Sequence, residues 1–149
     1  MDIIIKTLSK EFLRKNLQEF IAILKDEPAE YWHEEHFSKE LFGKFDISMI
    51  ALCNNALVGY IIASIKQEGA YIHKFMTSSQ YRSRGIGSRL QHAFEIKVKK
   101  LKLQKILLTI LAENKNASEF YEKNGYNKIG ERLDSINHRT LIIMEKVVQ

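Results

Sequence analysis

The sequence predicts an α+β fold, a mixed and mainly antiparallel sheet with helices on both faces and one βαβ crossover at residues 70–111. Three observations predict it. Apolar residues recur at helical spacing over Gly85–Leu101, between two short stretches typical of strands. The later stretch, Lys105–Leu111, is almost continuously apolar, as expected of a strand covered on both faces. Residues 47–65 instead have the two apolar runs and central asparagine pair of a hairpin.

The first third of the chain predicts one strand followed by helices. Ile3–Thr7 is a β-branched run typical of a strand. Ser9 follows it and can cap a helix through its hydroxyl oxygen. The apolar face of that helix would consist of Phe12, Leu13, Leu17, Phe20, Ile21 and Leu24. Pro28 ends this helix, and the pattern over Ala29–Phe42 predicts a second one.

The middle of the chain has strand character. A hairpin joins Ile47–Cys53 to Leu57–Ile65, because the asparagines of Asn54–Asn55 tolerate the positive φ of a tight turn. A further turn at Gln67–Gly69 leads into Ala70–Thr77, which predicts the next strand.

The last third completes the sheet. Asn116–Lys123 predicts a short helix, and Asn124–Gly125 is typical of a helix C-terminus. Tyr126–Ile129 and Leu141–Val148 predict the final strands. No repeat, low-complexity tract or linker interrupts residues 1–149, so we expect a single domain.

Composition favours one compact globule. The chain has 149 residues, 45% of them hydrophobic, and one proline. It has no apolar run long enough to cross a bilayer, and its first residues lack the basic leader and apolar core of a signal peptide. Cys53 is the one cysteine, so no internal disulfide can form, and its apolar neighbours indicate a small core residue. We therefore expect a cytoplasmic protein without a membrane partner.

The basic balance of the chain is open to two interpretations. A net charge of +5 is compatible with a nucleic acid or with a polyanionic small molecule as partner. A solvated helix surface is the simpler source, since lysines cluster around apolar residues in one stretch: Lys97, Lys99, Lys100, Lys102 and Lys105. No RNA-binding aromatic motif or zinc-finger spacing accompanies them, so we expect no nucleic-acid partner.

A glycine-containing loop joins the strand at Ala70–Thr77 to the following helix. Its sequence, Arg-x-x-Gly-x-Gly over Arg82–Gly87, brings backbone N–H groups together at a helix start. The helix dipole adds positive potential there, which favours a diphosphate. The pattern is neither a dinucleotide fingerprint, whose third glycine is replaced by Leu90, nor a Walker A loop.

A second motif follows the apolar strand and is read together with the first. Its residues are Asn114, Ala117, Tyr121, Gly125 and Tyr126. In this order and at this separation, the two motifs resemble those of the GNAT superfamily of N-acetyltransferases. The resemblance covers essentially the whole chain, and it implies a fold in which two neighbouring parallel strands splay apart to admit acetyl-CoA, without a metal.

The resemblance also implies site residues. The backbone of Phe75, Met76 and Thr77 would pair with the pantetheine arm, and the N–H of Met76 or Thr77 would polarise the thioester carbonyl. The pyrophosphate would be held by Arg82, Ser83, Arg84, Gly85, Ile86, Gly87 and Ser88. Asn114 would contact the pantetheine region. Tyr121 would face the sulfur, and as a phenol that is still protonated at neutral pH it can donate a proton to the leaving thiolate.

The general base is where this chain departs from its relatives. Some members of the superfamily have a glutamate near the position of Tyr71 or near that of Thr109, and neither position is acidic here. His73 lies two residues beyond Tyr71, on the same strand face, and is the nearest titratable substitute. A neighbour that simply satisfies the imidazole is the simpler interpretation of His73, and a water chain or an amine that arrives neutral would replace it as the base.

Other conspicuous residues have structural interpretations as well. Tyr121 also fits a helix position that packs on the core. His33 and His36 stand at helical spacing but lack the His-Glu-x-x-His order and further ligands, so we expect no metal site. Tyr31 and Trp32 belong to the core or to the wall of a substrate cleft. They lie in residues 28–45, the region where the resemblance locates acceptor specificity.

The sequence thus predicts an acyltransferase that moves an acetyl group from acetyl-CoA to a primary amine in a ternary complex. A non-catalytic acyl-CoA sensor on the same fold is the alternative, because the acidic base is missing. The acceptor, a small-molecule amine or a protein amine, stays open. Many members of the superfamily pair as dimers, so the resemblance allows a homodimer without fixing the oligomeric state.

Overall fold

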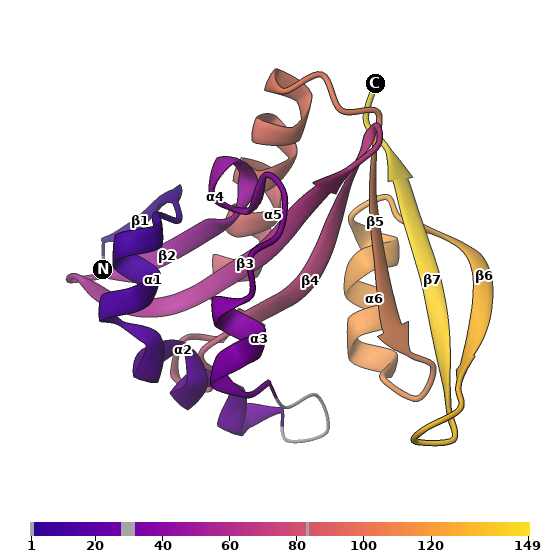
Figure 1. Ribbon diagram of the computed structural model, residues 1–149, viewed down its shortest axis with the longest axis horizontal. Helices are drawn as coiled ribbons and strands as arrows, with labels where there is room; N and C mark the ends of the chain where they lie inside the picture. The colour runs from indigo at the N-terminus through magenta and orange to yellow at the C-terminus, as the bar shows by residue number, and fades with distance from the viewer. Residues whose placement is uncertain (1, 28–31, 83) are drawn as a thin grey trace.

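The computed structural model describes residues 2–27, 32–82 and 84–149 (Figure 1). The described residues form one seven-stranded sheet in the order β1-β2-β3-β4-β5-β7-β6. Its strands are β1 (Ile3–Thr7), β2 (Met49–Cys53), β3 (Ala56–Lys66), β4 (Gly69–Thr77), β5 (Lys105–Leu111), β6 (Asn127–Asp134) and β7 (Arg139–Val147). Neighbours are antiparallel except for the parallel pair β4–β5, so the predicted mixed, mainly antiparallel sheet is confirmed.

Helices cover both faces of the sheet, as predicted. Figure 1 shows α1, α2 and α3 on one face and α5 and α6 on the other. The helices are α1 (Lys10–Lys15), α2 (Leu17–Ile23), α3 (Glu34–Ser38), α4 (Lys44–Ile47), α5 (Ile86–Lys100) and α6 (Lys115–Lys123), with 3₁₀ turns η1 (Leu24–Asp26) and η3 (Ser79–Tyr81). In the described part of the chain, no helix is long and apolar enough to span a membrane.

The first predicted helix is two helices. Ser9 caps α1 as predicted, accepting a hydrogen bond from the Phe12 N–H at 3.0 Å. Asn16 then leaves the helical conformation, with φ −116° and ψ 21°, and its side-chain amide donates to the Phe12 carbonyl. Asparagine competes with the helix for backbone hydrogen bonds in this way, which explains the break between α1 and α2.

Of the helix predicted over residues 29–42, the structure shows a helix only at Glu34–Ser38 among the residues that it describes. Residues 28–31 lie outside the described residues, α3 is short, and the chain turns extended at Lys39. The buried Lys44 explains this, because its Nζ donates to the carbonyls of Phe37 and Lys39 at the end of α3. Burial lowers the pKa of Lys44, while Glu40 opposes that shift.

Ile47, expected at a strand start, ends α4 instead.

Two hydrophobic clusters occupy the two faces of the sheet. On one face, Phe94 from α5 is fully buried with residues of β2, β3 and β5, and the cluster includes Cys53 as predicted. On the other face, Phe20 from α2 packs against the ring of Tyr60 at a centroid distance of 4.8 Å. The Tyr60 hydroxyl donates to the Phe20 carbonyl at 3.0 Å, so this helix is tied to β3 by packing and by a buried hydrogen bond.

The turns and the last strands follow the sequence prediction with one extension. Asn54 and Asn55 have φ of 50° and 68°, as the hairpin between β2 and β3 requires. The strand predicted at Tyr126–Ile129 continues to Asp134, so β6 is twice as long as expected. Ile129 is an extra residue in β6, because Lys128 pairs with Met144 and Gly130 with Ile143. This bulge shifts the side-chain alternation of the edge strand.

Replacement of Phe94 by alanine tests the assignment of the core. Removing a fully buried ring from α5 leaves a cavity against the sheet, so we expect a loss of about 3–5 kcal/mol in the free energy of unfolding. Ile96→Ala, two residues along the same helix at a side chain that is 46% exposed, should change it by less than about 0.5 kcal/mol. Urea denaturation measures both, and equal effects would contradict the packing of α5 described above.

Candidate functional site

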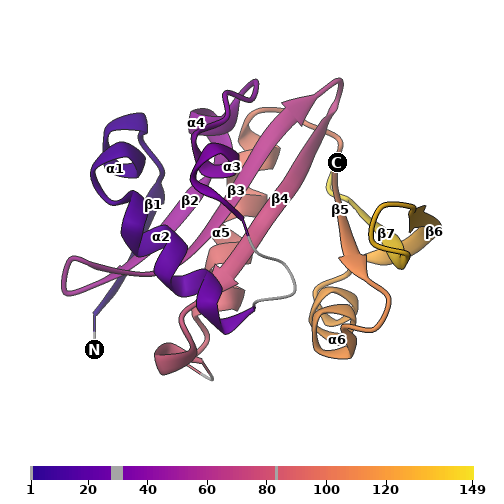
Figure 2. The same ribbon diagram turned by 60° about the horizontal axis from the view of Figure 1, so that its bottom comes forward.

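A cleft opens between β4 and β5. The two strands pair from Gly69–Lys105 to Tyr71–Leu107 and then diverge, as Figures 1 and 2 show. The cleft has a volume of about 340 Å³. It is lined by eight site residues predicted from the sequence, Phe75, Met76, Thr77, Arg82, Gly87, Asn114, Tyr121 and His73. The divergence of the parallel pair thus brings both sequence motifs to one cavity.

The edge of β4 presents backbone groups to this cleft. Ser78 N–H donates to the Val58 carbonyl at 2.8 Å, and Met76 is the partner of Tyr60. Hydrogen bonding alternates along an antiparallel ladder, so the N–H and C=O groups of Phe75 and Thr77 point away from β3 and toward β5. Beyond Tyr71 no β5 residue pairs with them in the described ladder. An extended ligand with amide groups would supply the missing strand.

The N-terminus of α5 is arranged to receive an anion. Gly85, with φ 74°, starts the helix, and none of the described side chains caps it. The first intrahelical bond runs from the Arg89 N–H to the Gly85 carbonyl, so the preceding N–H groups lack helical acceptors. No acidic residue occupies the first turn, where carboxylates usually balance the dipole. These features fit the diphosphate expected from the sequence.

The other predicted loop residues have different surroundings. Arg84, Gly85, Ile86 and Ser88 are not among the residues that line the cleft, and Ser83 lies outside the described residues. The Ile86 side chain is buried in the core, so its backbone N–H is the group that remains for a ligand. Arg84 lies over the Tyr81 ring, 5.6 Å from its centroid.

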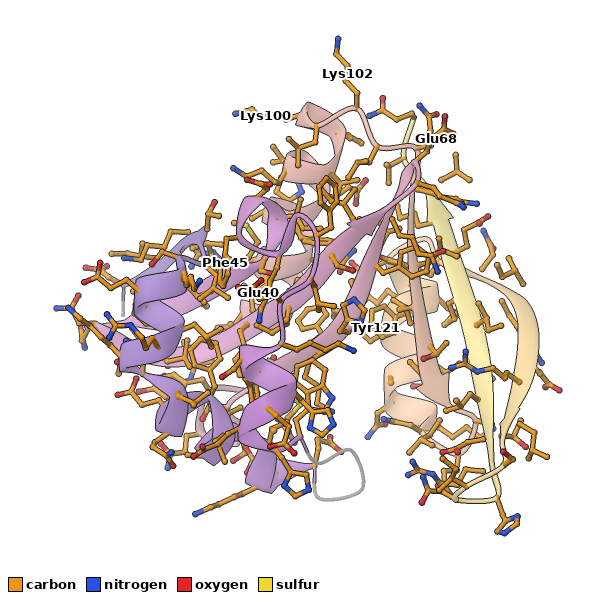
Figure 3. The ribbon with its side chains drawn as sticks, viewed as in Figure 1. Glu40, Phe45, Glu68, Lys100, Lys102 and Tyr121 are labelled. Atoms are coloured by element: carbon orange, nitrogen blue, oxygen red, sulfur yellow. The ribbon has the colours of Figure 1, made fainter. Side chains whose placement is uncertain are left out.

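Tyr121 lies at the opening between β4 and β5 (Figure 3). Its side chain is 7% exposed and belongs to a cluster of four aromatic rings. The Tyr121 ring makes edge contacts with Phe75, Phe120 and Tyr126 at centroid distances of 6.2, 5.3 and 5.2 Å. The packing role and the cleft-lining position predicted for this tyrosine therefore coincide in one residue.

Hydrogen bonds at both ends of α6 fix the position of Tyr121. Asn114 caps the helix start, its Oδ1 accepting from the Ala117 N–H at 3.0 Å. At the other end, Lys146 Nζ from β7 donates to the Asn124 carbonyl and to Glu95 of α5, both at 2.8 Å. Burial alone would raise the pKa of Glu95, but Lys146 and then Lys99 outweigh it and lower this pKa. The helix is thereby held against β7 and α5.

A buried hydrogen-bonded pair also supports the aromatic cluster around Tyr121. Gln91 Nε2 of α5 donates to the Tyr126 hydroxyl at 2.6 Å, and both side chains are buried. Burial raises the pKa of Tyr126, so this phenol stays neutral. Tyr126 follows α6 directly, and the hydrogen bond therefore anchors the end of that helix to α5.

His73 occupies a β-bulge in β4. Ile62 pairs with Lys74 and Ala63 with Ile72, so His73 has no partner of its own in β3. Its Nε2 shares a hydrogen bond of 2.7 Å with the Ser64 hydroxyl. Partial desolvation of the ring, followed by repulsion from Lys39 and Lys44, lowers the pKa of His73 although the side chain as a whole is exposed. The lowered pKa favours the neutral imidazole, the form that can accept a proton.

The bulge also brings a lysine to the same wall. Side chains on either side of His73 change face, and the neighbouring Lys74 is buried, with its Nζ 5.7 Å from the centroid of the Trp32 ring.

Trp32 packs on the core through Phe37, and Tyr31 lies outside the described residues. His36 is used locally, as its Nδ1 accepts from the His33 N–H at 2.9 Å. The described residues contain no group of three metal-ligating side chains.

Several lining residues were not predicted from the sequence. They are Glu27, Ile72, Lys74, Leu108, Ile110, Asn116 and Phe120, while Thr109 and Ala117, both named in the sequence motifs and strands above, also line the cleft. Phe120 and Asn116 lie within the second motif, so the neighbouring motif residues already indicated this part of the site. Glu27 ends the first helical region, some fifty residues before the loop that it faces, and no local pattern indicates that contact.

Comparisons with known proteins identify a family through one family model and a fold through solved structures. A family model described as the acetyltransferase (GNAT) family matches residues 11–126. No curated protein sequence matches the chain significantly.

Solved structures resemble the whole chain. The ribosomal-protein-S18-alanine N-acetyltransferase from Escherichia coli superposes with a TM-score of 0.86 at 18% identity, over 99% of this chain and 95% of that chain. Ard1 from Thermoplasma volcanium gives 0.87 at 21% identity, over 100% and 99%. Arabidopsis thaliana Naa50, in complex with the bisubstrate analogue CoA-Ac-MVNAL, gives 0.80 at 20% identity, over 98% and 99%. At these identities the likeness shows the fold.

The surroundings of His73 lead to a titration prediction. Its imidazole should titrate in NMR spectra below the ordinary histidine pKa of about 6.5. Lys39→Met should raise that pKa, because a repelling positive charge is removed, whereas Lys100→Met, at the far end of α5 (Figure 3), should leave it unchanged. An unshifted His73, or equal responses to the two variants, would show that the charges around the cleft are not those described.

Proposed function

The chain belongs to the acetyltransferase (GNAT) family, and from this membership and the cleft between β4 and β5 we propose that it transfers an acetyl group from acetyl-CoA to a primary amine. The observation that carries the proposal is the divergence of β4 from β5, which leaves the backbone groups of Phe75 and Thr77 facing the cavity. We extend it to a single catalytic domain over residues 1–149 that acts in the cytoplasm on a small-molecule or protein amine.

Acetyl-CoA fits the two halves of the cleft for different reasons. The pantetheine arm carries amides, which match the unpaired edge of β4. The diphosphate matches the uncapped N-terminus of α5, with Arg82 beside it on the cleft wall. An added Cβ at Gly87 would lie 3.7 Å from the Phe120 ring and the Thr77 hydroxyl, so glycine keeps the helix backbone accessible between them.

The residues of the cleft supply the groups that acyl transfer needs. When bound, acetyl-CoA provides an acetyl group activated as a thioester. The alternation of β4 favours the Thr77 N–H over that of Met76 as donor to the carbonyl oxygen, where a fixed donor contributes about 2.7–4 kcal/mol in comparable sites. Neutral His73 would accept the proton that the attacking amine loses, and the Tyr121 hydroxyl would protonate the departing thiolate.

The position of Gly87 gives a test of coenzyme binding. Gly87→Leu fills the space between Thr77 and Phe120, and we expect CoA affinity to fall by about tenfold or more, as an overpacked site loses binding. Gly130→Leu is the matched control, since an added Cβ there also meets its nearest atom at 3.7 Å, but in β6, away from the cleft. Calorimetry that shows unchanged CoA affinity in a folded Gly87→Leu protein would refute this placement.

The proposed activity is tested by free thiol release from acetyl-CoA in the presence of amines. The screen uses tripeptides with free N-termini, an N-blocked lysine peptide, spermidine and kanamycin. Thiol release with one of these amines supports an enzyme, whereas CoA binding without any turnover supports the acyl-CoA sensor.

Tyr121→Phe then tests the acid in the enzyme. The variant keeps the ring contacts but loses the proton, so kcat should fall by roughly 10²–10⁴-fold while CoA affinity changes little. The comparison is made where chemistry limits turnover. A wild-type rate in the variant under those conditions would assign Tyr121 to packing alone.

A further inference from the structure

One acidic side chain lines the cleft among the residues that the structure describes. It belongs to Glu27, directly after η1, and the charged side chains around it in the lining are Lys74 and Arg82. Glu27 Oε1 lies 3.9 Å from Arg82 Nη2, with the two side chains 38% and 47% exposed. The carboxylate that an amine acceptor would meet is therefore paired with the arginine expected to bind the diphosphate.

A second contact keeps the two groups together. Asp26, beside Glu27, accepts a hydrogen bond from the Ser79 N–H at 2.9 Å. Ser79 begins η3, the turn that ends just before Arg82. The end of the first helical region is thus hydrogen-bonded to the segment that leads into the diphosphate loop, which brings Glu27 close to Arg82.

The ion pair is weak enough to be exchanged. It is long, monodentate and half exposed, and pairs of this kind contribute little to stability. A diphosphate at the start of α5 offers Arg82 two bridging anionic groups and a bidentate geometry that guanidinium prefers. A bound diphosphate would therefore compete with the carboxylate for Arg82.

We propose that Glu27 is an acceptor-binding residue masked by Arg82, and that coenzyme binding unmasks it to hold the ammonium group of the acceptor. This inference rests on the proposed function and names a residue of its acceptor site. Before loading, Arg82 neutralises the one carboxylate of the described lining, so a cationic amine meets no unpaired negative charge from it. After loading, the carboxylate is free to attract the amine to the coenzyme.

The exchange predicts an effect on CoA binding that needs no acceptor. Glu27→Gln removes the competitor for Arg82, so CoA affinity measured by calorimetry should rise by about 1.4- to 5-fold. Glu19→Gln, an exposed carboxylate on α2 outside the cleft lining, should leave it unchanged. In an Arg82→Ala background, Glu27→Gln should have no effect, because the partner is absent.

The acceptor role is measured with the amine identified by the thiol-release screen. Glu27→Gln should raise its KM by about tenfold or more, with a smaller change in kcat, whereas Glu19→Gln should alter neither. Unchanged or weaker CoA binding by Glu27→Gln would overturn the exchange, as would a gain that persists in Arg82→Ala, since that indicates general repulsion of the anionic coenzyme.

An unchanged acceptor KM would overturn the binding role. A wild-type protein that binds CoA normally separates these failures from failure of the proposed function. If the wild type neither binds CoA nor releases thiol with any amine of the screen, the proposed function and this inference fall together.

Discussion

The site depends on the shortness of the hydrogen-bonded pairing between β4 and β5. Their parallel pairing covers Gly69–Tyr71 on β4 and ends there, although both strands continue. Buried backbone groups normally find partners, so a sheet that opens in its middle is costly unless something fills it. Here α5 and α6 hold the two halves from one face, through the aromatic cluster around Tyr121 and the Gln91–Tyr126 pair. The opening is stable because the helices support it, and it remains available because no strand closes it.

Sequence reasoning was strongest where the signal is local. The cap at Ser9, the turn at Asn54–Asn55 and the long helix after Gly85 depend on residues a few positions apart, and all three are present. It failed where distant residues decide the structure. Lys44 ends α3 by reaching back to its carbonyls, and the pattern of apolar residues carries no trace of that contact. The same reason hid Glu27, whose partner is far away in the chain.

The candidate site shows the same division. The glycines of the loop and the Asn114–Tyr126 motif could be found from spacing, because a helix start and a helix face impose it. The bulge at His73 could not, since one extra residue in β4 is defined by pairing with β3. Yet that bulge changes which side chains face the cleft, and it places a neutral imidazole and the buried Lys74 on one wall. Fine positioning in this site therefore comes from strand register.

The bulge at Ile129 has a consequence for solubility and self-association. β6 is one of the two edge strands of the sheet, and an exposed edge strand is a template on which other chains can add strands and aggregate. The extra residue kinks this edge, and Lys128, Glu131 and Arg132 add charges along an exposed strand. The bulge and the charges thus make strand addition at β6 unfavourable. The edge of β4 inside the cleft, in contrast, can still accept a strand-like ligand.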